Sequence, residues 1–154
     1  MSSLPPCASA MALAIDEPAI VQRVMNGLGH PTWLPWGPGV NGYDAALDVR
    51  PKSDPAKAKQ LLAEAGYPNG FSLTFDCPND RYVMDEQICT AVTSMLARIG
   101  VKASLTAQPK AQFFAKILAP KYDTDFYMLG WTPSTYDAHN ALYTLLGSRG
   151  NGRG

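Results

Sequence analysis

The order of strand-like and helix-like segments between residues 71 and 131 limits the folds open to this chain more than any other feature. Residues 71–75 alternate apolar and polar side chains with a period of two, and 101–106 and 125–131 are two further strand candidates. Apolar residues recur at helical spacing in the two segments between them, 84–99 and 108–118. This β-α-β-α-β order predicts parallel strands joined by right-handed crossovers. We therefore expect an α/β fold of three layers, a mostly parallel sheet with helices on its faces.

Local signals predict three more helices outside this region. Asp16 and Asp54 are each followed within two residues by proline, the pattern of a helix N-cap and first turn, and Gly27 and Gly66 follow as stop signals. Asp137 begins a last short helix. Residues 28–44 are rich in glycine, proline and aromatic residues and form a connection longer than usual, which favours a functional or packing role.

Charge and composition exclude several classes of function. The 13 Lys and Arg residues balance the 13 Asp and Glu residues, and no basic run occurs, so the electrostatic attraction that dominates binding to nucleic acid or anionic lipid is absent. No run of 18 apolar residues predicts membrane insertion. The three cysteines lack zinc-type spacing, so we expect neither a metal site nor a cofactor.

Four successive segments resemble one protein family. They are AIDEPAIV at 14–21, PGVNGYD at 38–44, DPAKAKQLLAEAGYPNGF at 54–71 and DFYMLGW at 125–131. Together they are similar to the family 5 extracellular solute-binding proteins of ABC importers, a group that includes dipeptide-, oligopeptide-, nickel- and haem-associated binding proteins. The similarity extends from about residue 10 to residue 150.

The resemblance implies a longer two-lobed parent whose lobes close around a small peptide-like or other polar solute, without chemistry on it, and deliver it to an importer permease. This chain corresponds to a fragment: an N-terminal edge without fixed structure at 1–9, the second lobe at 10–147 and a flexible Gly/Arg tail at 148–154. The parent is expected in the periplasm or outside the cell, although the start of this chain lacks an export signal. The surface left by the absent lobe is expected to favour self-association.

The resemblance also implies a ligand along the loop that follows the third strand. Trp131 would stack on the ligand there, with Tyr136 and Asp137 in the same loop. Peptide-binding relatives carry an acidic residue at the position of Ser134 and a basic residue at that of Met128, a departure that argues against a free peptide. Trp131 as a core side chain and Asp137 as the N-cap of the last helix remain open alternatives.

Other side chains near the strand ends have two interpretations each. Arg81 follows the first strand as a polar wall of the cleft, or it pairs locally with Asp76 or Asp85. Cys77 ends a strand and Cys89 lies on the helix that returns over it, so a disulfide and two buried thiols are both compatible with the pattern.

The alternative class of function is a small esterase-like hydrolase. Ser134, Asp137 and His139 are the residue types of a catalytic triad, but they lie within one short loop and no Gly-x-Ser-x-Gly elbow occurs. Asp137 and His139 also form only two of the ligands that a metal site needs. Loss of ester hydrolysis in a Ser134→Ala variant would separate the two classes.

Overall fold

The computed structural model describes residues 5–118, 123–145 and 147. The chain forms two compact units, which we treat separately. The sheet unit comprises Met1–His30 and Pro51–Met128, and the loop unit comprises Pro31–Arg50 and Leu129–Gly154. The range 10–147, predicted as one lobe, includes parts of both units, and the single lobe stays a prediction.

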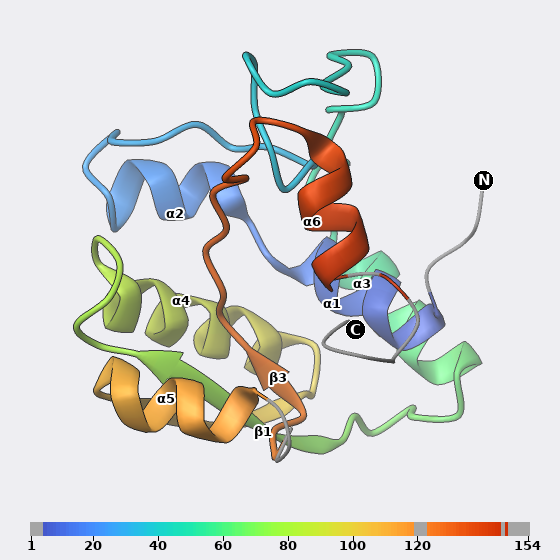
Figure 1. The fold of residues 1–154 in the computed structure, drawn as a ribbon. Helices are drawn as coiled ribbons and strands as arrows, with labels where there is room; N and C mark the ends of the chain where they lie inside the picture. Colours follow the sequence, from blue (N-terminus) through green and yellow to red (C-terminus); the bar gives the residue numbers. More distant parts are fainter. Residues whose placement is uncertain (1–4, 119–122, 146, 148–154) are drawn as a thin grey trace. The chain divides into compact units, whose positions relative to one another are not determined.

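The sheet has the predicted parallel arrangement (Figure 1). Strands β1 (Ser72–Pro78), β2 (Lys102–Gln108) and β3 (Phe126–Tyr127) follow the spatial order β2-β1-β3, and β1 pairs in parallel with both neighbours. Phe75 lies opposite Leu105 on one side and Phe126 on the other. The third strand is much shorter than the predicted 125–131, because only two of its residues pair with β1.

Two helices cover opposite faces of this sheet. Helix α4 (Asp85–Arg98) follows β1, and its buried side chains share a core with Phe75 and Cys77. Helix α5 (Lys110–Ile117) follows β2, and its Lys116 reaches Asp76, which points to the other face because neighbouring residues of a strand alternate. The two crossovers therefore place a helix on each face, and the three-layer α/β prediction is confirmed.

Three helices precede the sheet in the chain. The expected caps are present: Asp16 accepts a hydrogen bond from the Ala19 N–H at the start of α2 (Glu17–Arg23), and Asp54 accepts one from the Lys57 N–H at the start of α3 (Pro55–Glu64). Helix α1 (Pro6–Ala14) packs against α3. The expectation of an edge without fixed structure over 1–9 is therefore wrong for residues 6–9, which begin α1.

A disulfide joins the first crossover to the sheet. Cys77 of β1 and Cys89 of α4 are bonded, with their Cα atoms 6.5 Å apart, and both residues are completely buried. Cys7 is the free cysteine among the described residues and is half-buried. The bond ties the carboxyl end of the central strand to the helix that covers it.

The loop unit is organised by one carboxylate. Asp48 Oδ1 accepts hydrogen bonds from the Thr32 hydroxyl at 2.8 Å and from the N–H groups of Trp33 at 2.6 Å and Leu34 at 3.1 Å. The Tyr43 hydroxyl donates to its other oxygen at 3.1 Å. The Trp33 N–H, then the Thr32 hydroxyl, hold the pKa of Asp48 at about 2. This carboxylate fixes the long glycine- and proline-rich connection.

Helix α6 (Ala138–Leu145) completes the described part of the loop unit. The expected tail at 148–154 lies outside the described residues. Among the helices that the structure describes, none has the length and apolar character of a membrane span.

Candidate functional site

The segment expected to hold the ligand, residues 131–137, is fixed to the long connection of the same unit by a parallel backbone bridge. The Asn41 N–H donates to the Tyr136 carbonyl oxygen at 2.7 Å, and the Ala138 N–H donates to the Asn41 carbonyl oxygen at 2.9 Å. Gly42 must be glycine here, because a Cβ would lie 3.0 Å from that of Ala138 and its φ is +86°. The backbone of the candidate site is therefore held before any ligand arrives.

Asp137 is the N-cap of the last helix, which is one of the two interpretations that its position allowed, and its contact with a ligand stays a prediction. Its Oδ1 accepts the His139 N–H at 2.8 Å, which is the geometry of an N-cap, and its Oδ2 accepts the Asn41 side-chain amide at 2.7 Å. The His139 N–H, and after it the Asn41 amide, lower the pKa of Asp137 below its ordinary value. A charged, half-buried carboxylate therefore stands at the end of the loop.

The aromatic residues of the loop differ in how they are held. Trp131 is half-buried, and its indole Nε1–H donates to Asn140 Oδ1 at 3.0 Å, which fixes the ring against α6. Tyr136 is 69% exposed and has a φ of +50°, which is rare for a residue other than glycine. Its backbone is locked by the Asn41 bridge while its ring faces solvent, and strained residues of this kind cluster at functional sites. Ser134 is exposed in the same loop.

Arg81 lies in the sheet unit, in the loop that follows β1. Its N–H and that of Tyr82 donate to Asp85 Oδ2 at 3.0 and 2.9 Å. Burial acts to raise the pKa of Asp85, but the N–H groups of Tyr82, Arg81 and Glu86 outweigh it and leave that pKa below its ordinary value. The Arg81 guanidinium lies 5.2 Å from the centre of the Tyr82 ring. Arg81 thus contacts Asp85 through its main chain.

Asp76 has a different partner from the one expected. The Lys116 ammonium lies 2.9 Å from its Oδ1 and 2.8 Å from its Oδ2, and Gln108 Nε2 lies 3.4 Å from Oδ1. The alternative pairing of Arg81 with Asp76 is therefore wrong. Among the expected site residues, Trp131, Ser134, Tyr136 and Asp137 share the loop unit, and Arg81 belongs to the sheet unit.

The described structure does not support the hydrolase alternative. Catalysis by a triad needs a carboxylate that orients the imidazole and an imidazole that accepts the serine proton. Asp137 instead binds the main chain of His139 and the amide of Asn41. The His139 ring stacks on Tyr143 at a centroid distance of 5.3 Å. Within residues 5–118, 123–145 and 147, no group of three His, Cys, Asp or Glu side chains is placed to hold a metal ion.

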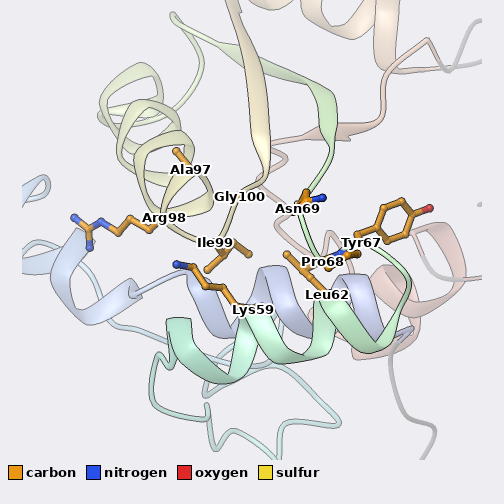
Figure 2. A pocket seen from close by; sticks show the side chains of 9 residues that line it. All are labelled: Lys59, Leu62, Tyr67, Pro68, Asn69, Ala97, Arg98, Ile99 and Gly100. Atoms are coloured by element: carbon orange, nitrogen blue, oxygen red, sulfur yellow. The ribbon is translucent and has the colours of Figure 1, made fainter.

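A separate hollow of about 340 Å³ lies in the sheet unit, between the C-terminal parts of α3 and α4. It is lined by Lys59 and Leu62 of α3, by the turn 67–69 and by residues 97–100. Figure 2 shows that the Tyr67 ring and the Arg98 side chain extend away from the centre of the hollow. None of the residues predicted for ligand binding lines it, so it is distinct from the candidate site.

Sequence reasoning missed two residues that shape the loop unit, Asp48 and Asn41. Asp48 offered no signal, because most of its partners lie 14 to 16 positions away. Asn41 had one, since Asn-Gly within a glycine-rich connection is typical of a tight turn. Its pairing with Asp137, 96 residues along the chain, is set by the fold.

Comparison with known proteins decides the family. The model for bacterial extracellular solute-binding proteins, family 5 (middle part), matches residues 9–153. The chain belongs to this family. The predicted resemblance is confirmed, and the matched range agrees with the predicted extent from about residue 10 to residue 150.

Curated relatives and solved structures of the family give the same result. The chain is 31% identical over 145 residues to a glutathione-binding protein of Pectobacterium atrosepticum, with 92% of this chain and 27% of the relative covered. Heme-binding protein A of Haemophilus influenzae is 33% identical over 147 residues, with 90% and 25% covered. The structure of the binding protein AgaA of A. tumefaciens R10 with agropinic acid superposes with a TM-score of 0.79 at 34% identity, covering 92% of this chain and 28% of that one.

The curated relatives are much longer than this chain. It spans about a quarter of the length of the curated relatives that it matches. The relatives are named as binding proteins and the family is one of solute-binding proteins, so the family supports the solute-binding prediction over the enzymatic one.

Proposed function

We propose that this chain is the ligand-facing part of a solute-binding protein that captures a small, polar, peptide-like solute for an ABC importer, in the periplasm or outside the cell. The family match over residues 9–153 carries this proposal. Relatives named for binding glutathione and heme support this range of solutes. No chemistry on the solute is proposed, because proteins of this kind work by differences in affinity between open and closed states.

We place the ligand contacts on the loop 131–137 of the loop unit. Arg81 belongs to the sheet unit and stays a separate prediction. Tyr136 supports this because its ring is exposed on a locked backbone, which lowers the entropy lost on binding. Trp131 offers the exposed part of its half-buried ring, Ser134 offers a hydroxyl donor and acceptor, and Asp137 offers a charged carboxylate.

The departure at Ser134 bears on the ligand. A serine hydroxyl cannot balance the charge of a free α-ammonium group as a carboxylate can. In our proposal Asp137 takes that role only in part, since both its oxygens already accept hydrogen bonds within the loop unit. The ligand class is therefore a solute whose recognition does not depend on one free amino terminus. Glutathione, with its two carboxylates and two amides, is the first probe.

Mapping by nuclear magnetic resonance tests this placement. Uniformly ¹⁵N-labelled chain would be titrated with glutathione and with a dipeptide up to tens of millimolar. The proposal expects shifts of the Trp131 indole N–H and of the amides of 134–137, and loss of these shifts in Tyr136→Ala. Lys59→Ala, which alters the separate hollow, serves as the matched control and should leave the shifts unchanged. Shifts confined to residues 59–69 and 97–100 would refute the placement.

Self-association belongs to the same proposal. The loop unit exposes the large apolar side chains of Leu47, Val49, Tyr136 and Leu142, three of them by 63% or more. A parent protein about four times as long would have further surface to cover them, and in this chain a second copy is the available cover. We therefore expect association to increase with protein concentration.

A further inference from the structure

Three sulfur atoms meet at the carboxyl end of the sheet. The Met128 Sδ lies 3.4 Å from Cys89 Sγ and 4.0 Å from Cys77 Sγ, and the two cysteines form the disulfide. All three residues belong to the sheet unit. We call this group the sulfur cluster.

The fold places these atoms together by register. Phe75 lies opposite Phe126 and Asp76 opposite Tyr127, so the next pair in the parallel register is Cys77 and Met128. The Met128 N–H donates to the Asp76 carbonyl oxygen at 3.1 Å, which holds that register one residue beyond the end of β3. Opposed residues of neighbouring strands project to the same face, and here α4 covers that face with Cys89.

We propose that reduction of the Cys77–Cys89 disulfide turns the sulfur cluster into a site for one soft monovalent metal ion, Cu(I) in the first place. Thiolate and thioether sulfur are the ligands that select Cu(I) over harder ions. A d¹⁰ ion bound to sulfur at about 2.3 Å in a trigonal arrangement sets its ligand atoms about 4 Å apart. The Met128 Sδ lies at that spacing from Cys77 Sγ, at 4.0 Å, and somewhat closer to Cys89 Sγ, at 3.4 Å. Cleavage of the disulfide frees the two cysteine sulfurs to separate to the same spacing.

The chemistry of loading balances in two steps. A phosphine reductant donates two electrons to the disulfide and becomes the phosphine oxide with oxygen from water, and the cysteines take up two protons. Cu(I) then displaces both protons to give two thiolate bonds and one thioether bond. In the metal-free reduced protein, the Asp85 carbonyl oxygen, 3.4 Å from Cys77 Sγ, accepts the thiol hydrogen.

The surroundings favour a soft ion over a hydrated one. Both cysteines are fully buried within the apolar core, and Met128 is half-buried, which gives the ion a path to the cluster past the thioether. The disulfide occupies the same two sulfur atoms, so the oxidised protein cannot bind the ion at this place. Only the form with a reduced Cys77–Cys89 pair would therefore bind the ion.

The experiment uses the whole 154-residue chain under anaerobic conditions. The protein is reduced with a water-soluble phosphine, freed of reductant, and made to compete with the chromophoric ligand bicinchoninate for Cu(I). We expect the reduced chain to withdraw one equivalent of Cu(I) and the oxidised chain to withdraw none at this site. Met128→Leu should weaken binding by about tenfold or more, as loss of one ligand interaction does, and Cys77→Ser with Cys89→Ser should abolish it.

Four controls keep the outcome decisive. Met95→Leu removes another partly buried core thioether and should leave the affinity unchanged, as should Cys7→Ser. Far-ultraviolet circular dichroism of the same samples reports whether the reduced chain remains folded. In urea the reduced parent chain and Met128→Leu should bind Cu(I) with equal affinity, because the sulfur cluster depends on the fold. Equal affinities of the folded reduced parent and Met128→Leu, or failure of the folded reduced chain to withdraw Cu(I), would overturn the proposal.

Discussion

Replacement of Lys116 by methionine should destabilise the sheet unit far more than an ordinary surface substitution. The Asp76 side chain is completely buried, whereas Lys116 is 29% exposed, and its ammonium lies 2.8 to 2.9 Å from both carboxylate oxygens. At an effective dielectric constant of about 20, unit charges at this distance attract by roughly 6 kcal/mol before desolvation is subtracted. Breaking a buried pair costs about 3–5 kcal/mol, because one charge is left without its partner.

Because Lys116 is partly exposed, the expected loss lies near the lower end of this range. We expect Lys116→Met to lower the free energy of unfolding by about 3 kcal/mol. Asp76→Asn should cost much less, about 1 kcal/mol, because the freed ammonium can reach water while the amide keeps contact with Gln108. The double variant should therefore be more stable than Lys116→Met alone, since removing the buried charge rescues the loss.

Urea unfolding followed by far-ultraviolet circular dichroism measures this series. Tryptophan fluorescence is unsuitable, because Trp33, Trp36 and Trp131 all belong to the loop unit. Lys110→Met on the same helix is the matched control and should change stability by no more than about 0.5 kcal/mol. A loss below about 1 kcal/mol for Lys116→Met, or a double variant less stable than Lys116→Met, would refute the reasoning.

Four further outcomes follow from the same structure. Reduction of the Cys77–Cys89 bond, 12 residues apart, should cost on the order of 3 kcal/mol, and unchanged urea midpoints with and without reductant would disprove this. The pKa of Asp48 is about 2 in the folded chain against 3.8 when unfolded. The stabilisation of the folded state by this carboxylate is therefore present above about pH 4 and lost as the pH falls toward 2. Fluorescence-monitored unfolding should show that Asp48→Asn removes this part of the pH dependence. Asp137→Ala should destabilise α6 by removing its N-cap, while Ser134→Ala should not, as measured by tryptophan fluorescence of the loop unit, to which Trp131 against α6 contributes. Light scattering should show association that Leu142→Glu reduces, and a monomer at every concentration would contradict it.

The sequence was most informative where structure is decided locally. Asp16 and Asp54 cap their helices as predicted, because an N-cap depends on residues only three positions ahead. The β-α-β-α-β order was correct for the same reason, since each element carries its own periodicity. Helix α1 escaped prediction because Pro6–Ala14 is apolar all round, without the one-sided pattern that marks a surface helix.

Contacts between distant segments could not be predicted from pattern alone. Lys116 of helix α5 pairs with Asp76 of strand β1, 40 residues away in the sequence, whereas the sequence suggested nearby Arg81 as the partner of Asp76. Asp48 and Asn41 organise the loop unit through partners that only the fold brings together. Met128 attracted notice only as a departure from its relatives, although the register of β1 and β3 places it beside the disulfide.

The affinity of this chain for a small peptide tests the central claim most directly. If the chain is one part of a receptor that holds its ligand by closure, about a quarter of the relatives' length, it lacks most of the contacts and cannot exclude water. Titration calorimetry at physiological salt should then give a dissociation constant in the millimolar range or weaker for glutathione and for any dipeptide. A micromolar constant would show that this chain forms a complete binding site alone and would contradict the account.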